Sequence, residues 1–429
     1  MTNARERTRI AIACQGGGSH TAFTAGVLKR LFTSEEISRY EVTGLSGTSG
    51  GAVCALLAWS ALVDGDPHQV GPKLERFWTE NSADSPFERL VNSLVLGAST
   101  LQNLGAAPAM SPYDSPVAAL DQFRELLLRQ LDFDRIVVDP QARLPMLLIG
   151  AVDVLSGEFH AFNSRRERIT ADTVLASAAF PQLFPAVRTD GGTFWDGLFS
   201  QNPPVRELID TEPDEIWVIQ INPKACADEP RTVLEIADRR NELAGNLSLY
   251  QELHFIEEID HLLDHGLLAP GGKYKHVVVR IIELSRSPAS RLLGPASKLN
   301  RDPAFIGALI ADGEQQAGEF LTALAFEEAW SRHDAEAVTR FLADDAEAFS
   351  TAPFPDRGPV RGRPALRDFL RAHFASGVCM DLNRKQVAGD RVTWTARGVV
   401  DGSGDVVHGT CEVTFLGSVA TSLRLGSPT

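Results

Sequence analysis

Short apolar runs alternate with helical patterns over most of the chain. Residues 8–14 (TRIAIAC) are apolar and rich in branched side chains, which predicts a buried strand of a parallel sheet. Residues 23–32 carry apolar side chains at helical spacing, so a helix is expected after this strand. Further strands are predicted at residues 40–45, 145–152, 215–221 and 276–282, with a buried helix at 50–62. Strands that alternate with helices are typical of an α/β sheet covered on both faces.

The pattern changes near residue 322. Amphipathic helices are predicted at residues 326–342 and 364–373, and alternating strands at 378–382, 391–400 and 406–425. These elements predict a separate α+β domain of ordinary size. We therefore divide the chain into a domain of residues 1–322 and a domain of residues 323–429.

Two long stretches of the chain, residues 43–63 and 91–113, carry no charged side chains. Residues 43–63 are long enough to span a bilayer, but their first half consists of glycine and hydroxyl residues, whose backbone groups lipid would leave unsatisfied. We interpret them as a buried strand, a turn and a buried helix. Residues 91–113 are broken by Gly, Ala and Pro, and predict either a loop over an apolar site or buried packing.

Composition and charge narrow the class of protein. Of the 429 residues, 44% are hydrophobic and 23% are charged, as in ordinary globular proteins. Fifty-six acidic residues against 41 basic ones give a formal charge of −15. This excludes nucleic acid as a partner, because its phosphates need a basic surface. It also disfavours attachment to anionic lipid, although peripheral apolar contact with lipid stays open.

The cysteines and the N-terminal residues indicate the cellular compartment of the protein. The five cysteines are widely spread and include no CxxC pair, which indicates reduced thiols. The apolar stretch before Gln15 is too short for a signal peptide, so a cytoplasmic location is expected.

Ser49 stands at the centre of a G-x-S-x-G motif (residues 47–51) between a predicted strand and a predicted helix. In this context the motif is a sharp turn that exposes the serine hydroxyl. The N–H groups at the start of the helix, beginning with Gly50, would then face developing negative charge.

Gly16, Gly17 and Gly18 follow the first predicted strand. Consecutive glycines let a loop direct several N–H groups to one point, as an anion hole for a tetrahedral intermediate requires. A dinucleotide-binding G-x-G-x-x-G loop is the competing interpretation. Because Thr21 stands where that fingerprint needs its third glycine, the cofactor interpretation is the weaker one.

Asp196 belongs to an Asp-Gly turn late in the first domain. An aspartate in a turn usually serves the turn itself, but a glycine loop, a serine turn and a late Asp-Gly rarely occur in this order by chance. Asp190 begins a competing Asp-Gly-Gly sequence six residues earlier. The apolar TFW before Asp196 and the SQNPP after the turn favour Asp196.

With these motifs, residues 8–322 resemble the patatin-like phospholipases. The glycine-rich G-G-G-x-R-G loop, the G-x-S-x-G turn and the D-G-[GA] turn of that family are similar to residues 16–21, 47–51 and 196–198, and ASAAFPQLFPAV at 176–187 matches as well. The resemblance implies a three-layer α/β/α sandwich with a mostly parallel central sheet. It also implies a serine acyl-ester hydrolase of lipid-like substrates.

The resemblance further implies a Ser–Asp dyad without histidine. Ser49 would attack an ester carbonyl and Asp196 would accept its proton. The N–H groups of Gly16, Gly17 and Gly18 would hold the oxyanion. A carboxylate serves as a base only where burial or missing counter-charge raises its proton affinity.

Three positions depart from the family pattern. His20 replaces the arginine of the loop, Thr21 replaces its last glycine, and Leu198 stands where Gly or Ala is usual. A weak or inactive patatin scaffold that binds a ligand is therefore the alternative. Acyl transfer shares the acyl-enzyme and is not separated by sequence. A Ser–His–Asp triad with His254 or His276 is the rival arrangement, although that fold usually brings in its nucleophile after several strands.

His261 and His265 are four residues apart on a predicted helix, a spacing that metal ligands use. Their HLLDH sequence lacks the glutamate of a zincin. We expect an ordinary polar helix face there, and neither a metal nor a cofactor.

Residues 323–429 resemble the SnoaL-like branch of the nuclear transport factor two superfamily, through residues 326–342 and 358–370. The resemblance implies a cone-shaped α+β domain. Steroid-isomerase chemistry in that superfamily uses a tyrosine, and all four tyrosines lie before residue 323, which disfavours it. We expect a ligand-binding or dimerising module and a homodimer formed through it.

Overall fold

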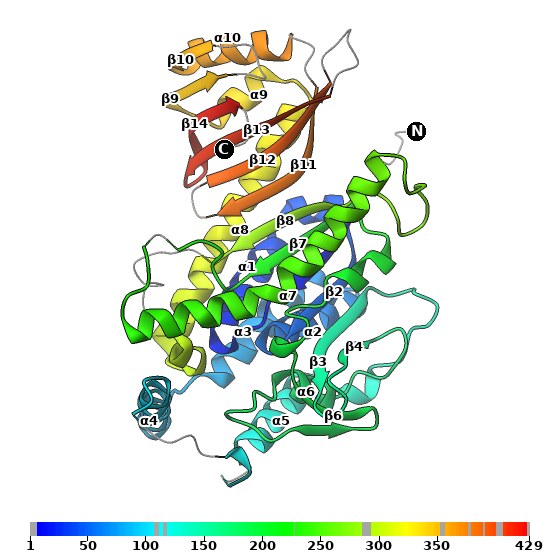
Figure 1. Ribbon diagram of the computed structural model, residues 1–429, viewed down its shortest axis with the longest axis vertical. Coiled ribbons are helices and arrows are strands. Elements are labelled where there is room, and N and C mark those ends of the chain that lie inside the picture. Colours follow the sequence, from blue (N-terminus) through cyan, green and yellow to red (C-terminus); the bar gives the residue numbers. More distant parts are fainter. Residues whose placement is uncertain are drawn as a thin grey trace. The chain divides into compact units, whose positions relative to one another are not determined.

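The computed structural model describes residues 7–106, 111–114, 118–226, 228–284, 293–351, 357–375, 379–388, 391–399 and 406–426. The chain packs as two compact units (Figure 1). The first comprises the chain up to Val277 together with Leu284–Glu314, and the second comprises Val278–Glu283 and Gln315–Thr429. The predicted strand ends at residues 378 and 400, and residues 107–110 of the uncharged stretch, lie outside the described residues.

The central sheet of the first unit is mostly parallel, as predicted. β1 (Thr8–Cys14) pairs in parallel with β2 (Tyr40–Thr48) and β7 (Glu215–Gln220), and β2 pairs in parallel with β3 (Met146–Asp153). Antiparallel partners extend the sheet beyond β3: β4 (Phe159–Asn163), β6 (Gly192–Asp196) and, beside β6, β5 (Val187–Thr189). The apolar runs predicted as strands are thus confirmed within one or a few residues at their ends.

Helices flank this sheet, which confirms the predicted fold class. The helices of the first unit are, in chain order, α1 (Ala22–Thr33), α2 (Gly50–Val63), α3 (Val70–Asn81), α4 (Pro86–Asn103), α5 (Ala118–Gln130), α6 (Ala171–Ala178), α7 (Val233–Asp264) and the first part of α8 (Pro303–Ser331). The long α7 lies over the sheet on the side toward the viewer in Figure 1.

The uncharged residues 43–63 form a buried strand, a turn and a buried helix. β2 is buried from Thr43 to Thr48, and α2 is buried from Gly51 to Ala61. A helix that is apolar on every side packs inside a protein, because no face of it suits water. None of the described helices combines the length and the apolar character that a membrane crossing requires.

Residues 91–113 differ from both interpretations of the sequence. The structure has a helix, α4, which begins with a capping box formed by Ser85 and Glu88 and runs to Asn103. None of its residues is buried. The capping box explains the early start, because it satisfies N–H groups at the beginning of a helix that no preceding turn can satisfy.

The strands of the second unit follow the order β10-β9-β14-β13-β12-β11-β8. The strands are β8 (Val278–Glu283), β9 (Leu342–Ser350), β10 (Arg357–Arg361), β11 (Cys379–Ala388), β12 (Arg391–Val399), β13 (Val406–Leu416) and β14 (Val419–Gly426). The sheet packs with α9 (Ala335–Arg340), α10 (Arg363–Phe374) and the end of α8. The α+β class of this part is confirmed.

One prediction about this unit was wrong. Residues 326–342 were expected to form one helix, but α8 ends at Ser331 and α9 begins at Ala335. Between them His333 has a positive φ of 54°, and Asp334 caps α9. The strand predicted at residues 276–282 is present as β8, which pairs in parallel with β11. Its Arg280 forms a buried ion pair with Glu327 of α8, with 2.7 Å between Nη1 and Oε2.

Two glycines allow α1 and α8 to pack closely in the first unit. A Cβ atom on Gly26 would lie 2.0 Å from the carbonyl oxygen of Ile310, and one on Gly313 would lie 2.1 Å from that of Phe23. Neither contact leaves room for a methyl group, because the obstructing atoms are backbone.

Gly26→Ala is therefore expected to lower the free energy of unfolding by about 1–3 kcal/mol, since α1 and α8 must separate. Gly97 lies in the exposed α4, and no heavy atom lies within 4 Å of the point that a Cβ on it would occupy. Gly97→Ala should raise the free energy of unfolding by up to about 1 kcal/mol through helix propensity. Urea unfolding of both variants measures the difference, and equal effects would contradict the close packing.

Candidate active site

Ser49 occupies the turn between β2 and α2 in an unusual backbone conformation. Its φ is 55° and its ψ is −128°, a region that residues other than glycine rarely adopt and that costs about 1–3 kcal/mol. The Ser49 carbonyl accepts hydrogen bonds from the N–H groups of Ala52 at 2.9 Å and Val53 at 3.2 Å, which start the helix. Such a turn presents the side chain away from the strand and the helix, as the motif predicts.

Close packing around the turn explains its small residues. A Cβ on Gly51 would lie 2.3 Å from the carbonyl oxygen of Cys14, at the end of β1. A larger residue at this position would push α2 away from the sheet. The Ser49 N–H donates to Ser177 Oγ of α6 at 2.9 Å, and Ser177 Oγ donates to the Gly150 carbonyl of β3 at 2.6 Å. The strained turn is thus held from both α6 and β3.

Asp196 lies beside Ser49 although 147 positions separate them in the chain. It ends β6, opposite Ala151 of β3, and only 3% of it is exposed. The Leu198 N–H donates a hydrogen bond to its carboxylate at 2.9 Å, and the Ser49 side chain lies close enough to favour the charged form. Burial raises the pKa of Asp196 from 3.8 to about 6, against the lowering effects of Leu198, Ser49 and the charge on Lys298.

The competing residues lie elsewhere. Asp190 is exposed, in the turn between β5 and β6. His254 is mostly exposed and pairs with Glu257 and Glu258 of the same helix, and His276 pairs with Asp260 and Asp264 of α7. The structure therefore brings Asp196, rather than one of these groups, to the Ser49 hydroxyl.

The glycine loop differs in one respect from the expectation that three N–H groups face an oxyanion. The Gly16 N–H donates to Asn202 Oδ1 at 2.7 Å, so it is engaged by the protein itself. For the N–H groups of Gly17 and Gly18, no acceptor is found within the part of the chain that the structure describes. Gly16 thus anchors the loop, and Gly17 and Gly18 are the donors that stay available.

Thr21 does not distort the loop, because the positive φ falls elsewhere. Gly18 has a φ of 57°, whereas Thr21 has a φ of −72° in the helical region. The Thr21 hydroxyl donates to the Gly18 carbonyl at 2.6 Å. Gly50 packs against the same place: a Cβ on it would lie 2.2 Å from Thr21 Oγ1. The start of α2 and the glycine loop are therefore adjacent.

Buried amide side chains hold the loop in place. Asn202 donates from Nδ2 to the Gly245 carbonyl of α7 at 3.1 Å, while its Oδ1 accepts from Gly16. Gln15 Oε1 accepts from the N–H groups of Ile221 and Asn222 at 2.7 and 2.8 Å. Buried amides that satisfy both donor and acceptor atoms fix the geometry of the loop before any ligand arrives.

His20, which replaces the family's arginine, is buried and neutral. Burial, with the nearby charge of Lys298, lowers the pKa of His20 to about 3. Its Nε2 lies 2.7 Å from Ser297 Oγ in η9 (Pro295–Leu299). Lys298 of the same segment is partly exposed, yet the protein surrounding its ammonium group lowers the pKa to about 8.

Sequence reasoning missed three residues that shape this site. Ser177 and Asn202 lie in segments that match the family, but a serine and an asparagine in such segments carry no sign of their partners. Lys298 had no signal, because it lies 282 residues after Gly16 and belongs to no motif.

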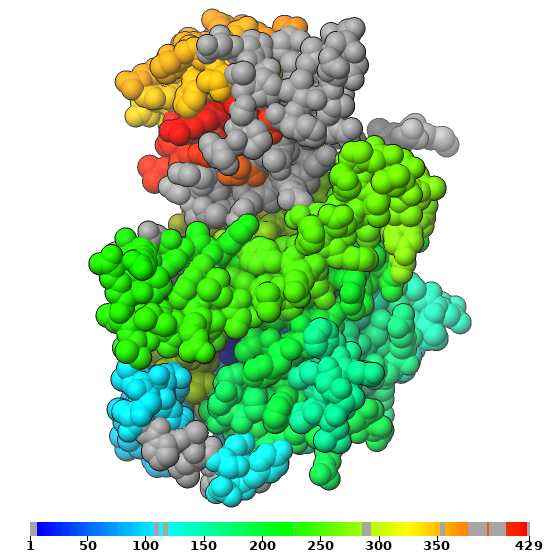
Figure 2. All heavy atoms as spheres, in the orientation of Figure 1, coloured from blue at the N-terminus to red at the C-terminus, as the bar shows by residue number. Residues whose placement is uncertain are grey.

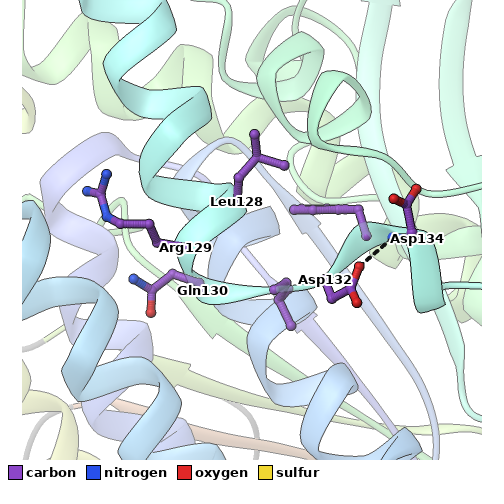
Figure 3. A pocket seen from close by; sticks show the side chains of 7 residues that line it. Leu128, Arg129, Gln130, Asp132 and Asp134 are labelled. Atoms are coloured by element: carbon purple, nitrogen blue, oxygen red, sulfur yellow. Dashed lines mark hydrogen bonds between the residues drawn. The ribbon is translucent and has the colours of Figure 1, made fainter.

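Two other features do not add to the site. A hollow of about 420 Å³ is lined by Leu128–Asp134 at the end of α5 (Figure 3), and none of these residues belongs to the site above. Asp132 serves the turn there by accepting from the Asp134 N–H at 3.1 Å. Among the described residues, no group of three or more His, Cys, Asp or Glu is arranged to hold a metal ion.

The comparisons with known proteins agree with this geometry. The family model described as patatin-like phospholipase matches residues 12–209. The chain carries a patatin-like phospholipase domain. A SnoaL-like domain follows it, since the model of that description matches residues 323–418. Ser49, Asp196 and the glycine loop all lie inside the patatin-like match, whereas Lys298 lies outside both.

Solved structures similar to this chain include NTF2-like proteins. One from Mesorhizobium loti is 24% identical and has a TM-score of 0.23, covering 26% of this chain and 93% of that chain. One from Burkholderia xenovorans is 23% identical with a TM-score of 0.22, covering 25% and 87%. A putative polyketide cyclase from Sinorhizobium meliloti is 21% identical with a TM-score of 0.21, covering 24% and 92%. These likenesses carry no argument about chemistry. No curated protein matches the chain.

Asp196→Asn in the patatin-like domain is expected to stabilise the protein at high pH. Because the pKa of Asp196 is raised from 3.8 to about 6, its ionisation costs stability as the pH rises between these values, and the cost is complete above them. The substitution should raise the free energy of unfolding at pH 8 by up to about 3 kcal/mol, and by little below pH 4.

Urea unfolding at both pH values measures this effect. Asp190→Asn is the matched control, since Asp190 is exposed and should show no such pH-dependent gain. An equal effect of Asp196→Asn at pH 4 and pH 8 would contradict the buried carboxylate.

Proposed function

We propose that the protein is a serine acyl-ester hydrolase with Ser49 as nucleophile and Asp196 as general base. The observation that carries the proposal is the Ser49 side chain beside a carboxylate that is 3% exposed and has a pKa of about 6. Such a carboxylate is ionised at neutral pH and still basic enough to take a proton. A surface carboxylate of ordinary pKa would be a weaker base.

The reaction follows from these positions. Asp196 takes the hydroxyl proton while Ser49 Oγ attacks the ester carbonyl, and a tetrahedral oxyanion forms. The intermediate collapses to an acyl-enzyme, and the leaving alcohol receives the proton from Asp196. Water then attacks the acyl-enzyme with Asp196 again as base, which releases the carboxylic acid and restores Ser49. An acceptor alcohol in place of water would give acyl transfer by the same steps.

The N–H groups of Gly17, Gly18 and Gly50 are the proposed oxyanion donors. Gly17 and Gly18 have no acceptor among the described residues, and Gly50 begins α2 next to them. N–H groups at a helix start carry partial positive charge, so they favour negative charge at this point. Gly16 is left out because Asn202 accepts its N–H.

An apolar wall next to Asp196 supports an acyl substrate. Phe180 follows α6 and stacks on Phe199 of η6 (Gly197–Phe199), with 6.0 Å between ring centroids and 8° between planes. Phe199 is half exposed, so the pair presents apolar area to solvent. The formal charge of −15 favours neutral esters over anionic ones.

Ester hydrolysis is expected for p-nitrophenyl butyrate and for longer p-nitrophenyl esters. Ser49→Ala and Asp196→Asn should each lower kcat/KM by at least about a thousandfold, because both groups act in the same proton transfer. Asp190→Asn should retain the wild-type rate. Full activity of Ser49→Ala, or loss of activity in Asp190→Asn alone, would overturn the assignment.

We further propose that α4 makes the peripheral contact with lipid. Its apolar side chains recur at helical spacing and are exposed: Phe87 (73%), Leu90 (58%), Val91 (42%), Leu94 (64%), Val95 (40%) and Leu101 (49%). The helix carries only one acidic and one basic side chain, Glu88 and Arg89, which suits a neutral lipid surface. Figure 2 displays α4 (cyan) on the same face of the first unit as the green α7.

The opposite side of α4 is fixed next to the glycine loop. Asn92 Nδ2 donates to Asn300 Oδ1 at 3.0 Å, and the Arg301 N–H donates to Asn92 Oδ1 at 2.9 Å. Asn300 directly follows η9, the segment that contacts His20. A lipid surface at α4 would therefore lie close to the elements that form the site.

Flotation with phosphatidylcholine vesicles tests this contact. Wild-type protein is expected to float with the vesicles, and Leu90→Glu/Leu94→Glu should lose binding while hydrolysis of soluble p-nitrophenyl butyrate is retained. Leu155→Glu, at an even more exposed leucine in the turn after β3, is the control and should bind like the wild type. Unchanged flotation of the α4 variant would refute the contact.

A further inference from the structure

The segment η9 lies directly on the glycine loop. The carbonyl oxygen of Lys298 lies 2.3 Å from the point that a Cβ on Gly18 would occupy, and the Lys298 Cβ lies 3.3 Å from it. Ser297 contacts His20 at 2.7 Å. Any side chain at residue 18 would displace η9, so the loop and this segment form one packed arrangement.

The ammonium group of Lys298 reaches the polar network under the loop. Its Nζ donates to Asn222 Oδ1 at 3.2 Å, and the Asn222 N–H donates to Gln15 Oε1, next to Gly16. The carboxylates that attract it are Asp196 at the end of β6 and Asp238 and Glu242 on α7.

Two further groups, Arg239 and His20, determine the charge around Lys298. Glu242 is also paired with Arg239 of α7, with 2.7 Å between Nη1 and Oε2. His20 on the loop is neutral at ordinary pH, because its pKa is about 3. The family's arginine would have provided a positive charge from the position of His20, and that charge is absent here.

We propose that Lys298 is the positioning residue that supplies the positive charge at the oxyanion loop, in place of the arginine that His20 replaces. This inference rests on the proposed ester hydrolysis. A nearby cation stabilises the negative charge of the tetrahedral intermediate, and the effect is strong where protein excludes water. The same cation keeps the Asp196 carboxylate ionised near neutral pH.

The charges of Lys298 and Asp196 depend on each other. Asp196 raises the pKa of Lys298, and Lys298 lowers that of Asp196, although burial dominates in both cases. Wild-type activity should therefore rise with pH as Asp196 ionises near 6. It should fall again near 8, where Lys298 loses its proton.

The test is the pH profile of kcat/KM for p-nitrophenyl butyrate. Lys298→Gln keeps a donor for Asn222 but removes the charge, so it should lower the rate at pH 7 by about tenfold or more and move the acid limb to higher pH. Lys298→Arg keeps the charge, so it should restore most of the rate and abolish the alkaline fall. Lys273→Met is the control, since Lys273 pairs with Asp210 on the surface and should keep both limbs.

A purely structural role for Lys298 gives a different result. The kcat/KM would then fall in both Lys298 variants, while the acid and alkaline limbs of the pH profile keep their midpoints. That outcome would overturn the inference and leave the proposed function unaffected. If wild-type protein hydrolyses no ester, the proposed function fails instead. A ¹³C NMR titration of the Asp196 carboxyl carbon tests the effect of Lys298 on Asp196 without turnover: a higher midpoint in Lys298→Gln than in wild type supports this effect, and an equal midpoint refutes the inference.

Discussion

A carboxylate beside a serine hydroxyl can act as a base only if it is desolvated enough to hold a proton and still ionised at working pH. Asp196 meets both conditions, because burial raises its pKa to about 6 while the hydrogen bond from Leu198, the nearby Ser49 side chain and the charge of Lys298 limit the rise. A fully unpaired buried carboxylate would stay protonated, and a solvated one would be too acidic. The other features of the site adjust the surroundings of this one group.

Segments that are remote in the chain meet at Asp196. The strained turn at Ser49 is held by Ser177 and by the close approach of α2 to β1, so the hydroxyl keeps its direction. The loop after Asp196 uses Asn202 to fix Gly16, which leaves Gly17 and Gly18 free to face an oxyanion. In Figure 2, dark-blue atoms from the beginning of the chain are visible in a hollow beside the green α7, consistent with access of solvent to this region.

The sequence predicted what depends on local pattern. β1, the Ser49 turn and α2 could be predicted because each has a local sequence signal. These signals are a short apolar run, glycines on both sides of a serine, and an uncharged helical segment. That Asp196 lies near Ser49 was predicted from the family resemblance, because their separation in the sequence does not indicate that they are close in space. Lys298, the Gly16–Asn202 hydrogen bond and the exposure of α4 were not predictable, because each depends on packing between distant segments.

Reaction of Ser49 with a fluorophosphonate tests the central claim most directly, because this reagent forms a covalent bond only with an activated serine. Peptide mass spectrometry after labelling should find the adduct on Ser49 in the wild type, at a rate that increases with pH through about 6 as Asp196 ionises. The label should be absent from Asp196→Asn under the same conditions. Labelling that is absent from Ser49 in the wild type, or that is equally fast without the Asp196 carboxylate, would contradict the account.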